Sequence, residues 1–234
     1  MKRLALTLLA TLALTHPAAA LTLREVTVTC PIDGKKFTYQ AMMSGTSFGQ
    51  RLDLKPIGPT AAPPPLPVCP DDHFVVFEEE LDPATIEQLA AFIKTRPYRK
   101  AIADGESSYY LHALLLEARF RHPEAIGYAY LRASWQVEGD AAKTERYLTE
   151  ALKWYERALP IPSPPDRALQ AELITGELER RLGRFDAAAA RFTRLAARPE
   201  ATAAPFKGII ARQQRLITDK DRAPHEIPKD AYPQ

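Results

Sequence analysis

The stretch Ile174–Leu195 reads ITGELERRLGRFDAAAARFTRL and combines small residues, a glycine turn and aromatic residues at helical spacing. Five positions define the pattern: Gly176, Gly183, Phe185, Ala188 and Phe192. A small residue lets two helix backbones approach, a glycine turns the chain between them, and aromatic rings fill the gap to the next helix pair. The stretch therefore predicts two short helices that pack side by side and are joined at Gly183.

This spacing resembles the tetratricopeptide (TPR) repeat, which stacks such helix pairs. An earlier segment is similar to a looser copy, with Gly127 and Tyr130 in its first helix, Gly139 at the turn and Tyr155 in its second helix. An ordinary helical bundle would explain the apolar stripes equally well, but it explains the joint glycine, alanine and aromatic spacing less well. We expect antiparallel helix pairs that bury one face and leave a groove on the other.

Further helix signals lie on both sides of this stretch. Asp82-Pro83 is typical of a helix start, and Pro97 is predicted to end that first helix. Other helices are predicted at 106–121, 123–139, 141–159, 166–182, 186–197 and 204–217. The segment 56–67 has too many prolines for a helix or a central strand, and this predicts an extended surface loop.

The first 80 residues have a different pattern, with short β-type runs at 26–29 and 74–77. Each run lies beside one of the two cysteines of the chain. Cys30-Pro31-Ile32-Asp33 and Cys69-Pro70-Asp71-Asp72 share the form Cys-Pro-x-Asp. A zinc knuckle has the form Cys-Pro-x-Cys-Gly, and two facing knuckles make a four-thiolate site. Here Asp stands where each knuckle would have its second cysteine.

Residues 25–200 resemble a bacterial family catalogued only as a domain of unknown function, with a zinc-ribbon-like head followed by TPR-like helices. The resemblance rests on the two Cys-Pro segments and on the helical pattern that extends to Phe192. It implies a mainly α fold, in which TPR-like antiparallel helix pairs follow a small β-rich, degenerate zinc-ribbon-like head. It implies no activity, and the four-cysteine metal site does not transfer because positions 33 and 72 are Asp.

Three states of the cysteines are open at this stage. A Cys30–Cys69 disulfide would staple the head, and an oxidising compartment favours it. The alternative is a zinc site built from Cys30, Asp33, Cys69 and Asp72 or His73, which is the one cofactor that the sequence suggests. Free thiols are the third state.

The N-terminus has the features of a cleavable secretory signal. Met1-Lys2-Arg3 precedes an apolar run at 4–14, and Ala18-Ala19-Ala20 offers a cleavage site after Ala20. The run is about half the length that a membrane-spanning helix needs. We therefore expect a periplasmic or secreted protein without stable membrane insertion. The predicted organisation is a signal at 1–20, a head at 21–80, a helical domain at 81–218 and a disordered tail at 219–234.

The charge of the chain argues against nucleic acid as a partner. There are 31 basic and 29 acidic residues, and removal of Lys2 and Arg3 with the signal leaves the two signs balanced. The last third contains an arginine run that could be a surface for an acidic partner, although the pattern favours a solvated helix face. The run comprises Arg180, Arg181, Arg184, Arg191 and Arg194.

The sequence predicts no catalytic residues. It has no Cys-x-x-Cys, no P-loop and no Gly-x-Ser-x-Gly elbow. The favoured hypothesis is a scaffold or adaptor module that binds a protein or peptide in a helical-repeat groove. One alternative is a metal-binding protein that uses the Cys/Asp site, and another is a hydrolase whose site is assembled from residues distant in sequence.

Overall fold

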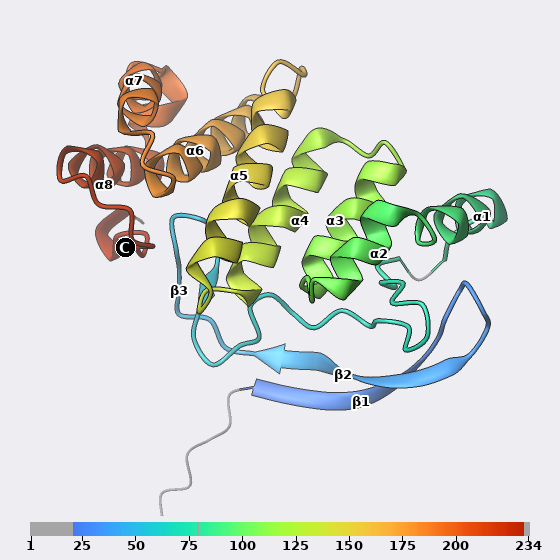
Figure 1. Cartoon of the computed structure of the whole chain (residues 1–234). Coiled ribbons are helices and arrows are strands. Elements are labelled where there is room, and N and C mark those ends of the chain that lie inside the picture. Colours follow the sequence, from blue (N-terminus) through green and yellow to red (C-terminus); the bar gives the residue numbers. More distant parts are fainter. Residues whose placement is uncertain (1–20, 79, 232–234) are drawn as a thin grey trace, which may run out of the picture.

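A computed structural model describes residues 21–78 and 80–231 (Figure 1). The N-terminal part forms two small antiparallel sheets. One is a hairpin of β1 (Leu21–Thr29) and β2 (Lys36–Gly45), and the other pairs β3 (Gly49–Gln50) with β4 (Pro56–Ile57). The hairpin lies along one side of the helices in Figure 1.

Eight α-helices follow within the described part of the chain, so the protein is mainly α as predicted. Neighbouring helices pack as antiparallel pairs. The helices are α1 (Pro83–Phe92), α2 (Arg96–Ala103), α3 (Ser108–Ala118), α4 (Pro123–Gln136), α5 (Ala141–Ala158), α6 (Pro165–Arg181), α7 (Phe185–Ala196) and α8 (Phe206–Thr218). Single 3-10 turns occur at Pro199–Thr202 and Lys229–Ala231.

The helix starts follow ordinary capping chemistry. The Asp82 carboxylate accepts from the Thr85 backbone N–H at 2.9 Å, and Asp140 accepts from Lys143 N–H at 2.9 Å. The prediction that Pro97 ends the first helix was wrong. Pro97 instead lies in the first turn of α2, a helix that the sequence pattern did not predict. Proline is tolerated there because the backbone N–H groups of the first turn have no partner within the helix.

The glycine–aromatic contacts expected from the repeat pattern are present in both pairs. A β-carbon placed on Gly176 would lie 2.6 Å from Cε2 of Phe192, and one placed on Gly127 would lie 2.9 Å from Cδ2 of Tyr155. At each glycine, an aromatic ring from the second helix of the pair therefore lies directly against the backbone of the first helix. Gly183 turns the chain between α6 and α7 with a φ of 76°.

The remaining repeat positions lie in the core that these pairs build. Tyr130 is buried among residues of α4 and α5, and its hydroxyl group donates to Glu117. Ala188 is fully buried in the apolar cluster that α6, α7 and α8 share, and Phe185 is half-buried against that cluster. The pattern read from the sequence therefore marks contacts between helices.

The N-terminal segment does not form a separate head. Phe74 and Val75 share one apolar cluster with Leu89 of α1 and Leu115 of α3. Leu52 is instead buried in a different cluster with residues of α6, α7 and α8. The expected boundary near residue 80 is therefore not a boundary in packing. The run 74–77 also forms no strand, because Val75 makes only an isolated bridge to Val68.

The segment after α8 is packed, so the prediction of a disordered tail is wrong for residues 219–231. The Ile227 N–H donates to the Gln50 carbonyl, and the Leu52 N–H donates to the His225 carbonyl, both at 2.8 Å. Ile227 and Ala231 are 9% and 3% exposed. The few apolar side chains of this polar segment are thus buried against α8 and the β3 region, which sequence composition does not reveal.

The predicted secretory signal at 1–20 lies outside the described residues. Among the residues described, no helix is both long and apolar enough to cross a bilayer. The proline-rich segment has no regular structure beyond β4, as expected. It packs on α3, where the Tyr109 hydroxyl group donates to the Pro64 carbonyl at 3.0 Å.

The Gly176 contact can be tested by adding one methyl group. We expect Gly176→Ala to destabilise the protein by about 1–3 kcal/mol, because the new carbon would overlap the Phe192 ring and outweigh the helix propensity that alanine gains. The measurement is urea unfolding followed by circular dichroism. Gly139→Ala is the matched control and should be nearly neutral, since nothing lies within 4 Å of the place that its added methyl group would take. Equal stabilities of the two variants would contradict the close approach.

Candidate functional site

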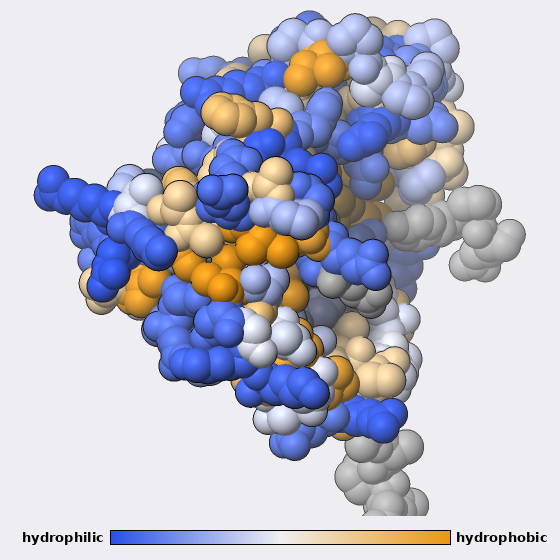
Figure 2. All heavy atoms as spheres, turned by 90° about the vertical axis from the view of Figure 1, so that its right-hand side faces the viewer, coloured by the Kyte–Doolittle hydropathy of each residue, from blue (hydrophilic) through white to orange (hydrophobic). Residues whose placement is uncertain are grey.

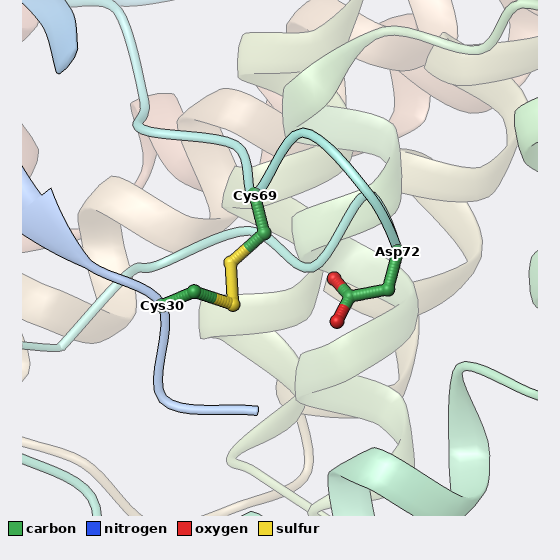
Figure 3. A group of neighbouring side chains, drawn as sticks. All are labelled: Cys30, Cys69 and Asp72. Carbon is green, nitrogen blue, oxygen red and sulfur yellow. A yellow bond between two sulfur atoms is a disulfide. The ribbon is translucent and has the colours of Figure 1, made fainter. Parts of the chain in front are cut away.

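Cys30 and Cys69 form a disulfide, which confirms the first of the three expected states (Figure 3). Their Cα atoms are 5.7 Å apart, and the two residues are separated by 39 positions in the sequence. Both cysteines are 1% exposed and belong to the cluster that contains Phe74 and Leu89. The bridge therefore joins the end of β1 to the segment that packs on α1 and α3.

The two Cys-Pro-x-Asp segments adopt the same turn. The Cys30 N–H donates to the Lys35 carbonyl at 2.8 Å, and the Cys69 N–H donates to the Phe74 carbonyl at 2.8 Å. Asp33 accepts from the Lys35 N–H at 3.0 Å, and Asp72 accepts from the Phe74 N–H at 2.8 Å. Each Asp thus caps its own turn and stabilises the knuckle shape without a metal ion.

The fifth position of each turn has a left-handed backbone. Gly34 has a φ of 73°, and His73 has a φ of 60° at the equivalent place. The His73 N–H donates to the Cys69 carbonyl at 3.1 Å, and the His73 carbonyl accepts from the Tyr98 hydroxyl group at 2.8 Å. The backbone of His73 therefore completes the second turn, while its side chain is exposed.

These residues do not fit the four-ligand zinc site considered as an alternative. The possible ligand atoms of Cys30, Cys69 and Asp72 lie within 4.8 Å of one another, and Asp72 points toward the disulfide in Figure 3. Neither Asp33 nor His73 belongs to this group within the part of the chain described. The two sulfur atoms are bonded to each other, so they do not offer the thiolates that zinc binds.

A shallow cavity of about 460 Å³ lies beside the knuckles and is mainly apolar. It is lined by Ile32, Asp71, Asp72, His73, Ile93, Lys94, Arg99, Ile102 and Ala103. The face that carries α1 and α2 is seen in Figure 2, where apolar surface gathers in a band bordered by hydrophilic side chains. This face is one candidate for contact with another molecule.

A larger groove lies on the other half of the protein. Two adjoining hollows of about 630 and 500 Å³ share Gln50, Leu54, Glu124, Arg167, Gln170 and Ile174. Their walls come mainly from α4, α6 and α8, and Tyr155 of α5 adds to the lining of the second hollow. The β3 region and Ile227 of the tail complete the lining. The groove therefore extends across three helices and is closed on one side by the β3 region and the tail.

The groove has an apolar floor and a charged rim. Leu52, Leu173 and Ile209 are buried in the floor, whereas Gln170 and Asp166 are exposed. The Arg167 guanidinium group donates to the Glu124 carboxylate at 2.7 Å, and this pair connects α6 to α4. Because the Arg167 side chain is 56% exposed, the ion pair contributes little to stability and a ligand could replace either partner at small cost.

A buried ionic network holds the β3 loop and the tail, which form the non-helical wall of this groove. Arg180 is fully buried and donates to Glu177 at 2.8 Å and to the Ala223 carbonyl at 2.9 Å. Arg181 donates to the Asp53 carboxylate at 2.8 Å, so it holds the loop after β3. These contacts place the loop and the tail against α6.

The arginine run of α6 and α7 is therefore largely buried, contrary to the solvated face that the sequence favoured. Arg180, Arg181 and Arg191 are each 9% exposed or less. Burial raises the pKa of the Glu177 carboxyl group, and the charge of Arg180 opposes that rise. Asp53 and Glu179 were missed because their distances in sequence from Arg181 and Arg191 follow no motif. Glu177 precedes Arg180 by three residues on the same helix, a spacing at which side chains can pair.

Fold and site together define a class: a mainly α protein of antiparallel helix pairs, preceded by two knuckle turns that a disulfide joins. The chain belongs to the DUF2225 family, described as uncharacterized proteins conserved in bacteria, and the match covers residues 68–217. The family match includes the second knuckle and the helices through most of α8. No curated protein and no solved structure matches the chain significantly.

The disulfide should be the main covalent support of the N-terminal half. Closing a loop of about 40 residues restricts the unfolded chain, and we expect Cys30→Ala to lower the free energy of unfolding by about 4 kcal/mol. Cys30→Ala/Cys69→Ala should lose no more than the single variant, because both remove the same bond. The measurement is urea unfolding of oxidised wild type and of both variants. An unchanged midpoint on removal of either cysteine would contradict this role.

Proposed function

We propose that this protein is an exported, non-catalytic binding module that takes a peptide segment of a partner protein into the groove between α4, α6 and α8. The observation that carries the proposal is the groove itself, which is lined mainly by α4, α6 and α8. Helical repeats present such faces to extended or helical peptides. The proposal is that the peptide lies across the three helices.

The lining indicates the chemistry of the peptide. The two hollows share a partly apolar floor, which suits two apolar side chains a few residues apart. Asp166 is exposed at the rim, and no basic nitrogen of the described residues lies within 4.0 Å of it. A basic residue flanking the apolar positions would complement Asp166 and Glu124.

The fixed walls of the groove support binding without large rearrangement. The β3 loop and the tail are held by backbone hydrogen bonds to each other and by Arg180 and Arg181. A groove whose walls are already ordered requires less loss of conformational entropy on binding.

Selection of peptides from a random display library on the purified protein would test the groove. We expect selected peptides to share an apolar pair with a basic neighbour, and Gln170→Trp to weaken their binding at least about tenfold, because the indole would fill both hollows. Phe120→Ala is the control, since Phe120 is 91% exposed and lines neither hollow. Peptides that bind wild type and Gln170→Trp equally would refute the groove as the site.

Export is tested separately. We expect the protein expressed in a bacterium to be found outside the cytoplasm and to begin at Leu21, because the segment before it has the charge, apolar core and small residues that signal peptidase requires. N-terminal sequencing and fractionation measure this. Replacing Ala18 and Ala20 with bulky residues should leave the precursor uncleaved, and an intact N-terminus in the cytoplasm would contradict export.

A further inference from the structure

A further hollow lies against the tail and differs in character from the groove. Its volume is about 340 Å³, and it opens between the C-terminal half of α8 and residues 225–229. It is lined by Arg212, Arg215, His225, Glu226, Ile227, Pro228 and Lys229. Ile227 lines both this hollow and the peptide groove, so both lie against the tail.

The charges around this hollow are unbalanced. Arg212 and Arg215 are three residues apart on α8 and therefore share a face, and Lys229 faces them from the tail. Among the side chains that the structure describes, which do not include that of Asp230, no carboxylate oxygen lies within 4.0 Å of any of these three cations, whereas Arg180, Arg181 and Arg191 all have such partners. Glu226 is the one acidic residue among the described side chains of the lining. Cations gathered around one hollow repel each other unless an anion enters.

The structure also orients one of these cations. His225 lies 2.7 Å from Asp221 through Nε2 and 3.3 Å from the Arg212 guanidinium group through Nδ1. The Asp221 pKa is lowered by a hydrogen bond from the Ala223 N–H and by His225, so Asp221 is ionised and accepts from Nε2–H. Nδ1 is then free to accept from Arg212. His225 thereby holds the Arg212 guanidinium group through one N–H, and the other N–H donors of Arg212 stay available to a ligand.

Hydrogen bonds and packing hold the tail side of the hollow in place. Residues 225 and 227 are hydrogen-bonded to the β3 region, and Arg180 binds the Asp221 and Ala223 carbonyls. Farther along, Ala231 packs on Gly208, where an added β-carbon would lie 2.9 Å from the alanine methyl group. The basic side chains therefore converge from two segments whose backbones are both held in place.

We propose that Arg212, Arg215 and Lys229 form a binding site for a phosphate group, with His225 as the residue that positions Arg212. Two guanidinium groups and an ammonium group match the charge and the several acceptor oxygens of a phosphate dianion better than those of a single carboxylate. The family match ends at residue 217, so the tail half of the site lies beyond the matched region. The site is distinct from the peptide groove and does not depend on the proposed function.

The test uses the full chain at low salt with inorganic phosphate as the probe, titrated by isothermal calorimetry at neutral pH. We expect one phosphate to bind, and Arg212→Gln and Lys229→Gln each to weaken binding at least about tenfold, since each removes a charge-assisted hydrogen bond. Arg194→Gln is the matched control, because Arg194 is exposed on α7 and does not line the hollow. Acetate at equal concentration should bind much more weakly than phosphate.

Circular dichroism of each variant separates a binding defect from misfolding. Lys229 is exposed, so we expect Lys229→Gln to fold normally. This variant therefore tests the site even if Arg212→Gln does not fold. His225→Gln should weaken binding less than Arg212→Gln, because it removes the positioning residue and leaves the three cations. The proposal is overturned if phosphate does not bind, if acetate binds equally well, or if Lys229→Gln binds phosphate as tightly as Arg194→Gln.

Discussion

Arg180 is buried in α6 with its guanidinium group surrounded by acceptors from three segments of the chain. It donates to Glu177 on its own helix, to Gln213 on α8 and to the carbonyls of Asp221 and Ala223 in the tail. A buried cation has to be matched in this way, because an unpaired charge in the interior is very costly. That requirement couples the position of the tail to the position of α6, and the shape of the groove beside the tail follows from it.

The consequences appear at two places along the tail. At one, the tail and the β3 loop complete the groove over α4, α6 and α8. At the other, the tail brings His225 and Lys229 against α8. Arg181 extends the same arrangement to Asp53 in the β3 loop. The tail and the β3 loop are thus positioned by hydrogen bonds and an ion pair from one helix, whereas the helices themselves are positioned by apolar packing and glycine–aromatic contacts.

The N-terminal knuckles illustrate a different constraint. In a zinc knuckle the metal ion holds the two turns together, whereas here Asp33 and Asp72 cap the turns and a single covalent bond joins them. The geometry of the turns is nearly the same at both sites, including the left-handed backbone at Gly34 and His73. The turn shape is therefore separable from metal binding, and the Cys-Pro-x-Asp pattern is consistent with a disulfide-linked version of the same architecture.

The sequence by itself determined the features that depend on neighbouring residues. Apolar periodicity and caps such as Asp82 located most helices, and the spacing of Gly176 and Phe192 predicted how one pair packs, because helix geometry converts spacing directly into direction. The matching knuckles indicated that Cys30 and Cys69 could be joined. Only the tertiary structure decided that the arginine run is buried, that the tail is ordered and that Asp53 meets Arg181. The contacts of Arg180 with Gln213, of Arg181 with Asp53 and of Ile227 with Gln50 join distant segments of the chain, and no local rule reports where two such segments meet.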